Sequence, residues 1–268
     1  MRLHIRHRTR YAYASPVGYS VQLLRLVPRL DGVQQLLSWQ VDVPGRRCLQ
    51  VDAFGNRTQL VTVEGLHAEL VVEAQGVVET DVSAEGRIPD DGLLSPLAYL
   101  APTSLTEPDP ALMTMAQGLF DGGRPLRFAL SDLMERVTRA VRYRTGVTAV
   151  SDSARLVLAN GEGVCQDQAH VAIAVCRAGG IPARYVSGYL LDEVATQAAS
   201  HAWIDVWDAA SNGWLSCDVT HRRLAGAGLC RLAVGRDYLD AAPIRGVRRG
   251  GGDEALSVSV QVSASQQQ

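Results

Sequence analysis

The sequence predicts an α+β protein. An N-terminal antiparallel β-sandwich is followed by a core in which a cysteine-bearing helix packs on an antiparallel sheet. Three observations support this prediction. Apolar and polar residues alternate in several segments before residue 87, as they do in half-buried strands. A glycine-flanked apolar run around Cys165 has the length of a buried helix. Two strand-like segments then meet at Asn212-Gly213, which is a hairpin signal.

The N-terminal region contains four segments that alternate or are rich in β-branched residues. Turn signals at Ser15-Pro16, Pro44-Gly45 and Gly55-Asn56 separate them. An antiparallel arrangement follows from the short connections. The four expected strands cover residues 3–13, 36–43, 59–65 and 69–79.

Helical patterns begin after a connecting segment that is rich in Pro, Asp and Gly. One helix is expected to start at Pro110, and a second is expected to start with Ser131 as its N-cap. An alternating segment near the end predicts one more strand, and the final residues are expected to be disordered. The predicted organisation is an N-terminal β-sandwich region, a connecting segment with the first helix, a core and a tail, at residues 1–90, 91–125, 126–264 and 265–268.

Cys165 is placed in the first turn of a predicted helix. Small residues from Gly161 to Gly163 precede it, an apolar run continues to Cys176, and two glycines then end the helix. Free backbone N–H groups and the helix dipole favour a thiolate at this position. Such a thiolate is a nucleophile if a histidine lies nearby. A buried cysteine on its own more often serves packing.

The predicted hairpin after residue 200 supplies a histidine and an aspartate. Residues 201–207 alternate, with His201 on the face of Trp203 and Asp205, and 214–218 forms the returning strand. Folding the hairpin brings Asp218 directly or diagonally opposite His201. An aspartate beside a histidine Nδ1–H fixes the tautomer and stabilises the imidazolium. Cys, His and Asp in this chain order are the parts of a papain-like nucleophilic site. Asp205 is the alternative third residue.

The same segments resemble a known family. The runs GVCQDQAHVAIAVCRAGGIPARYVSGYL, HAWIDVWDAASNGWLSCDVTH and GRDYLDAAPIRGV are similar to the core of the transglutaminase-like superfamily. The runs HRTRYAYASPV, RLVPR and DAFGN are similar to the bacterial transglutaminase-like N-terminal region. The resemblance implies that Cys165 is the nucleophile, His201 the base and Asp218 the orienting acid. One departure is that the family's acidic residue is usually followed by Pro-Thr, where this chain has Val219-Thr220.

Composition narrows the classes of function. The net charge of −2 leaves no basic surface of the kind that binds nucleic acid. Transmembrane runs and a secretory h-region are absent from the sequence, and five scattered cysteines do not suggest a disulfide framework. These features predict a soluble, cytoplasmic protein with no membrane partner. All 26 basic residues are arginine, so the chain offers no lysine side chain as an acyl acceptor.

The function expected from these residues is cysteine-dependent hydrolysis of peptide or amide bonds through a thioester. Transfer to an amine, as in transglutaminases, and a non-catalytic scaffold are the alternatives. Tyr143 is the candidate for a second oxyanion donor beside the Cys165 N–H. Two roles are open for Trp203, contact with substrate and packing within the hairpin. No cofactor is required and no metal motif is present. A peptide or protein amide is the expected substrate, and the sequence leaves the oligomeric state open.

Overall fold

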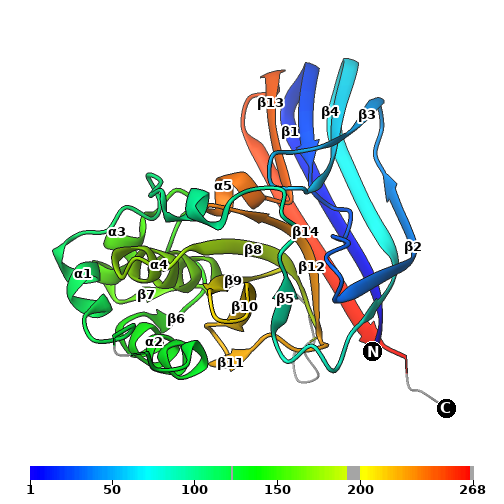
Figure 1. Ribbon diagram of the computed structural model, residues 1–268. Coiled ribbons are helices and arrows are strands. Elements are labelled where there is room, and N and C mark those ends of the chain that lie inside the picture. The colour runs from blue at the N-terminus through cyan, green and yellow to red at the C-terminus, as the bar shows by residue number, and fades with distance from the viewer. Residues whose placement is uncertain (122, 192–199, 266–268) are drawn as a thin grey trace.

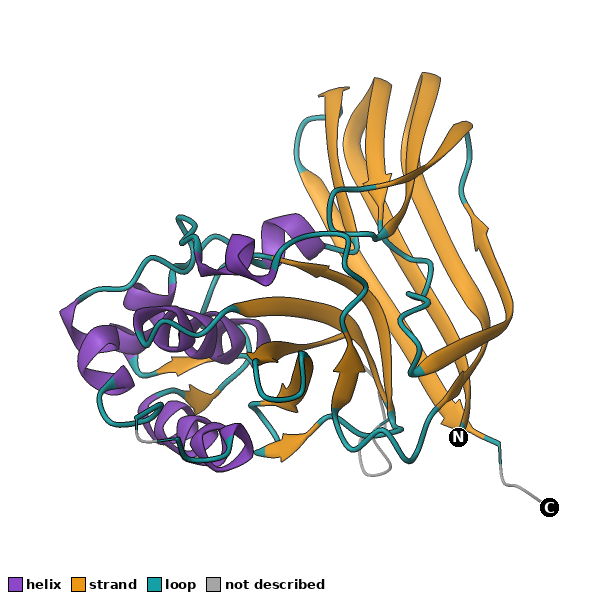
Figure 2. Ribbon diagram, viewed as in Figure 1, coloured by secondary structure: helices purple, strands orange, loops and turns teal. Residues whose placement is uncertain are grey.

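The computed structural model describes residues 1–121, 123–191 and 200–265. These residues form two six-stranded antiparallel sheets and a short parallel pair of strands, with the helices gathered beside the second sheet (Figures 1 and 2). The predicted α+β class is therefore confirmed. The predicted tail lies outside the described residues except for Ser265, whose backbone N–H donates to the carbonyl of Arg2.

Two long strands form the centre of the N-terminal sheet. They are β1 (Arg2–Leu24) and β4 (Arg57–Thr80), which pair antiparallel along most of their length. The remaining strands pair with one or the other. The partners of β1 are β14 (Glu254–Ala264) and β13 (Ile244–Gly250), and those of β4 are β2 (Gln34–Asp42) and β3 (Arg46–Val51). All strands of this region are thus hydrogen-bonded into one continuous sheet, whose inner face packs on the core sheet through Tyr189, Cys230 and Leu232.

The predicted turn at Ser15-Pro16 is wrong. Both residues lie inside β1, where the register with β4 shifts between Ala12 and Val17. A bulge of this kind absorbs the proline, which has no N–H to donate, and bends the strand without ending it. The turns at Pro44-Gly45 and Gly55-Asn56 do separate strands.

The predicted core segment, residues 126–264, contributes strands to both sheets. The last strands, β13 and β14, pair with β1 and so belong to the N-terminal sheet, although their residues come last in the chain. An alternating segment can complete any open sheet edge, so its sequence does not identify its partner. The two ends of the chain consequently build one sheet together.

The core sheet carries the hairpin that the sequence predicted. Its order is β11-β10-β9-β8-β12, with β5 also pairing with β10. A helix-bearing face of this sheet is formed by Ala202, Ile204 and Val206 of β9, which belong to the same apolar cluster as the central helix. The strands are β5 (Arg87–Pro89), β8 (Ala183–Leu190), β9 (Ser200–Asp208), β10 (Gly213–Asp218), β11 (Arg223–Leu224) and β12 (Leu229–Gly235).

The helices surround α4 (Cys165–Ala178), which lies on the core sheet. The others are η1 (Pro96–Leu100), α1 (Pro110–Ala116), α2 (Leu126–Ala140), α3 (Ala154–Asn160) and α5 (Tyr238–Ala241). The prediction of Ser131 as an N-cap is wrong, because α2 already begins at Leu126 after Pro125. Proline is favoured at helix starts, and the apolar stripe of α2 begins before Ser131, at Ala129. Among the described helices, each is too short or too polar to cross a membrane.

The N-terminal motifs RLVPR and DAFGN join the two sheets. Arg25 Nε donates to Asp52 Oδ2 at 3.1 Å, and Arg29 donates to Asn56 Oδ1 at 2.6 Å. The Asn56 amide in turn donates to the carbonyl of Val234 at 2.7 Å and accepts from its N–H at 2.8 Å. These buried bonds tie the loop between β3 and β4 to strand β12. They hold the N-terminal sheet at a fixed position beside the core.

Candidate active site

Cys165 is the first residue of α4. The helix start is stabilised by Asp167, whose Oδ2 accepts from the Val164 N–H at 2.8 Å and from Thr148 Oγ1 at 2.7 Å. Burial raises the pKa of this carboxyl, and the two hydrogen bonds oppose that rise. Asp167 therefore caps the helix. Gly163 is required here because a Cβ at that position would lie 2.7 Å from the Asp167 Cβ.

Tyr143 lies beside the start of this helix. It belongs to β6 (Arg142–Tyr143), which pairs in parallel with β7 (Glu162–Gly163), so Tyr143 is opposite Gly163. The Arg144 N–H donates to the Gly163 carbonyl at 2.8 Å and extends this contact. Burial and the neighbouring Cys165 both raise the pKa of Tyr143, so its hydroxyl stays protonated. The structure thus brings Tyr143 to the same cleft as Cys165.

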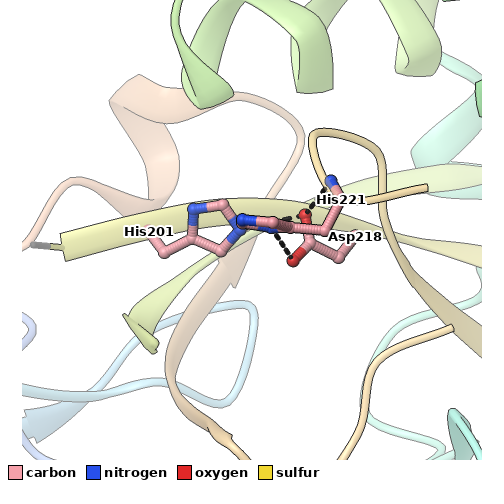
Figure 3. A group of neighbouring side chains, drawn as sticks. All are labelled: His201, Asp218 and His221. Carbon is pink, nitrogen blue, oxygen red and sulfur yellow. Dashed lines mark hydrogen bonds and ion pairs between the residues drawn. The ribbon is translucent and has the colours of Figure 1, made fainter. Parts of the chain in front are cut away.

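His201 and Asp218 meet across the β9–β10 hairpin (Figure 3). Cys217 is opposite Ile204, so Asp218 is one residue further along and diagonal to His201. The diagonal arrangement is one of the two that the sequence allowed. His201 Nε2 lies 3.0 Å from Asp218 Oδ1, and both side chains are buried. The expectation that Nδ1 would face the aspartate is wrong, since Nε2 does.

The charged forms of His201 and Asp218 stabilise each other. Burial lowers the pKa of His201, but its interactions with Asp218 and with the Cys165 thiol outweigh burial and raise it to about 9. Burial raises the pKa of Asp218, but hydrogen bonding and charge from His201 and His221 leave it below its usual value. A protonated imidazole between a carboxylate and a thiol is the combination that these shifts favour.

His221 is a site residue that the sequence interpretation missed. Its Nδ1 lies 2.7 Å from Asp218 Oδ2, and its backbone N–H donates to Asp218 Oδ1 at 3.3 Å (Figure 3). The spacing of three residues after Asp218 was the available signal, because it places His221 on the turn that follows β10. Among the described residues, the ligand atoms of His201, Asp218 and His221 lie within 4.8 Å of one another. This group could hold a divalent metal ion, which would compete with the His201–Asp218 pairing.

The tryptophans of the hairpin are packing residues. Trp203 is completely buried, its Nε1 donates to Ser216 Oγ at 3.0 Å, and its ring stacks near His201 with centroids 6.0 Å apart. Of the two roles expected for Trp203, complete burial favours packing, and Trp203 is not among the described residues that line the cleft beside Cys165. Trp203 supports the His201 ring from behind.

The carboxylate of Asp205 pairs with two arginines and not with His201. Its carboxylate accepts from Arg184 Nε at 2.8 Å and from Arg231 at 2.6 Å, and all three side chains are buried. Arg231 also pairs with Asp31 at 2.6 Å. This buried ion cluster braces the core sheet. Asp205 is therefore fully engaged as a structural group, and Asp218 is the carboxylate beside His201.

A cleft with a volume of about 360 Å³ opens beside Cys165. This volume is within the range of small-molecule and peptide side-chain sites. Its floor is formed by the start of α4 and by His201, and its far wall comes from the N-terminal sheet. The described lining residues are His7, Thr9, Tyr11, Tyr143, Val150, Val164, Cys165, Gln166, Tyr185, Ser187, Ser200, His201, Ala202, Tyr238, Pro243, Ile244, Leu256 and Val258.

The fold defines a class of protein: a cysteine-bearing helix on an antiparallel sheet, with an N-terminal sheet at its side. Residues 3–79 match the bacterial transglutaminase-like N-terminal region, and residues 114–219 match the transglutaminase-like superfamily. An uncharacterized protein of Mycobacterium leprae is 32% identical over 278 residues, which cover 98% of each chain. The chain belongs to the transglutaminase-like superfamily.

Two further similarities were found. A crystal structure described as a "putative cysteine protease from Cytophaga hutchinsonii" has the same fold, with a TM-score of 0.81 and 21% identity, covering 100% of this chain and 92% of that one. A protein-glutamine gamma-glutamyltransferase of Pseudomonas aeruginosa is 33% identical over 116 residues. That match covers 39% of this chain and 17% of the other.

Proposed function

We propose that the protein is a cysteine-dependent acyl hydrolase that cleaves peptide or other amide bonds through a thioester on Cys165. The observation that carries this proposal is the position of the His201 imidazole, which lines the same cleft as the Cys165 thiol and lies 3.0 Å from the Asp218 carboxylate. The thiol stands at a helix start and lines a cleft. These are the nucleophile, base and orienting acid that acyl transfer through cysteine requires.

The proposed reaction has two halves. In the first, His201 takes the thiol proton and the sulfur bonds to the carbonyl carbon, which moves an electron pair onto the carbonyl oxygen. The tetrahedral intermediate then expels the amine, which leaves with the proton from His201. In the second, water attacks the thioester and gives a proton to His201, and the sulfur leaves and regains a proton. Asp218 keeps the imidazole oriented and stabilises its positive charge throughout.

The oxyanion formed in both halves needs donors that are already in place. The backbone N–H of Cys165 is the first, because the N–H groups of a first helical turn have no partner within the helix. Tyr143 is our candidate for the second. Tyr143 lines the cleft, its hydroxyl stays protonated, and the β6–β7 pairing fixes the residue beside Gly163. We place the reaction in the cytoplasm, since the five cysteines are free thiols and a reducing compartment would keep them so.

Transfer of the acyl group to an amine is the second candidate function. The similarity of 39% of the chain to a protein-glutamine gamma-glutamyltransferase favours it. Both reactions form the same thioester and differ only in whether water or an amine attacks it. A non-catalytic scaffold is the third reading, and it gives no reason for a buried histidine to lie between a thiol and a carboxylate.

Intact-mass trapping tests the proposal. The protein is mixed with a panel of peptide and glutamine-amide substrates, quenched in acid and weighed, with Cys165→Ala as the matched control. An added acyl mass in the wild type and none in the control is the expected result, and no adduct with any substrate would contradict it. A primary amine and heavy-oxygen water added together then separate the two reactions. Heavy oxygen in the product carboxylate indicates hydrolysis, and a dominant amine adduct indicates transfer.

A further inference from the structure

The N-terminal sheet supplies one wall of the cleft beside Cys165. Thr9 and Tyr11 of β1 line it together with their cross-strand partners on β14, which are Val258 and Leu256. Thr9 and Tyr11 come from the beginning of the sequence, and Leu256 and Val258 come from near its end. All four lie more than 90 residues in sequence from Cys165. The wall is therefore a separate structural contribution to the site.

Exposure along β14 shows where this wall faces open space. Val260 is 5% exposed because it packs in the interface between the two sheets. Two residues earlier on the same face, Val258 is 52% exposed, and Leu256 is 58% exposed. The same face thus changes from packed interior to open cleft as it reaches the site. Apolar side chains exposed next to a nucleophile mark a surface that a ligand covers.

Apart from Cys165 and His201, the described lining residues bring no charged group to the cleft, since none is Asp, Glu or Arg. The histidine in the N-terminal wall is neutral at physiological pH, because burial lowers the pKa of His7 to about 4. Its ring nitrogens are already engaged, Nδ1 with the Tyr189 hydroxyl at 2.7 Å and Nε2 with Thr9 Oγ1 at 2.8 Å. Away from Cys165 and His201, a charged substrate group would lose its hydration without gaining a partner.

Most of the remaining lining residues are aromatic or apolar. Tyr11, Tyr143, Tyr185 and Tyr238 all contribute, and Tyr185 and Tyr238 meet edge to face with ring centroids 6.3 Å apart. Aromatic rings gain most from contact with other rings and with branched aliphatic groups. A cavity of about 360 Å³ is large enough for one such side chain next to the reacting carbonyl.

We propose that this wall is the subsite for the acyl side of the substrate, and that it selects an uncharged apolar or aromatic side chain next to the reacting carbonyl. The inference rests on the proposed function, because the acyl group must stay in the cleft while it is bound to Cys165. The N-terminal sheet is then a specificity element of the enzyme as well as part of its fold.

Substrates that differ only in this side chain test the proposal. A series of N-acetyl-aminoacyl thioesters with one leaving group would carry Gly, Leu, Phe, Asp or Arg. We expect kcat/KM for Leu and Phe to exceed that for Gly by about 10- to 200-fold, the range that one buried apolar group gives. We expect Asp and Arg to fall below Gly. Equal rates across the series would overturn the subsite and leave the chemistry standing, whereas no turnover of any member would overturn both.

A charge placed in the wall gives a second test. Val258→Glu should lower the ratio of kcat/KM for Phe over Gly at least about tenfold and raise the relative rate for Arg, since a carboxylate on the cleft wall attracts the guanidinium. Val247→Glu is the matched control, because Val247 is exposed on β13 of the same sheet and does not line the cleft. An unchanged ratio in Val258→Glu, in protein that melts cooperatively, would overturn the assignment of this wall.

Discussion

Replacing Asp205 with asparagine is expected to destabilise the whole chain. Asp205 is completely buried, and its carboxylate accepts from Arg184 at 2.8 Å and from Arg231 at 3.0 and 2.6 Å. Arg231 has a second anion, Asp31, at 2.6 Å. Arg184 has no other carboxylate partner among the described residues, although its guanidinium lies 4.1 Å from the centre of the Trp214 ring. The substitution therefore leaves Arg184 as a buried, unneutralised charge.

The size of the effect follows from that geometry. Removing one partner of a buried ion pair costs about 3–5 kcal/mol. Asparagine keeps one acceptor oxygen and Asp31 still neutralises Arg231, so we expect the lower end, about 3 kcal/mol. For a chain of this size, that loss lowers Tm by roughly 6–12 °C.

The pH dependence of this loss has a definite sign. Burial raises the pKa of Asp205, but the Arg231 and Arg184 guanidiniums outweigh it and hold the pKa well below its usual range. A depressed carboxyl pKa stabilises the fold fully above its unfolded value of about 3.9, and the stabilisation is lost as pH falls through the folded value. The gap between wild type and variant should thus be widest near neutral pH and shrink in acid.

Thermal unfolding followed by circular dichroism, at neutral pH and in acid, measures both effects. The control is Asp132→Asn, which makes the same change in an exposed ion pair with Arg124 and should cost less than about 1 kcal/mol. Equal melting of wild type and Asp205→Asn would refute the reasoning about the ion cluster. Loss of hydrolysis with unchanged melting would instead assign to Asp205 the role that we give to Asp218.

Three further outcomes are expected. Iodoacetamide at mildly acidic pH should alkylate Cys165 faster than the exposed Cys48, because the His201 imidazolium stabilises the thiolate. His201→Ala should remove this difference in rate, and the labelling of each cysteine is measured by peptide mass. The rate of amide hydrolysis should fall as pH rises through about 9, where His201 loses the proton that the leaving amine needs, and the hydrolysis rate of an activated thioester should fall less. The raised pKa of His201 also stabilises the fold; this stabilisation is complete below about pH 6.5 and is lost as pH rises through about 9. His221→Ala should lower kcat by roughly 3- to 10-fold, which is less than the effect of Asp218→Asn, because water can replace a partly exposed partner of the Asp218 carboxylate. An unchanged kcat would show that His221 has no part in the site.

The sequence by itself determined the local parts of the site. Glycines on both sides of the apolar run fix the limits of α4, so Cys165 falls at its first residue in the structure. The strand period and Asn212-Gly213 fix the hairpin, and with it the face that His201 shares with Trp203. These signals depend on neighbouring residues only, which is why a single chain is enough to locate them.

Tertiary structure alone decided which groups meet. Asp205 and Asp218 both suit the place beside His201. Asp205 instead pairs with the buried Arg184 and Arg231, and Arg184 has no other carboxylate partner among the described residues. Likewise, β14 completes the N-terminal sheet and forms a wall of the cleft, although nothing in its alternation names β1 as its partner. Hydrogen-bonding edges and buried charges are matched across the whole chain, so segments that are distant in sequence determine the outcome.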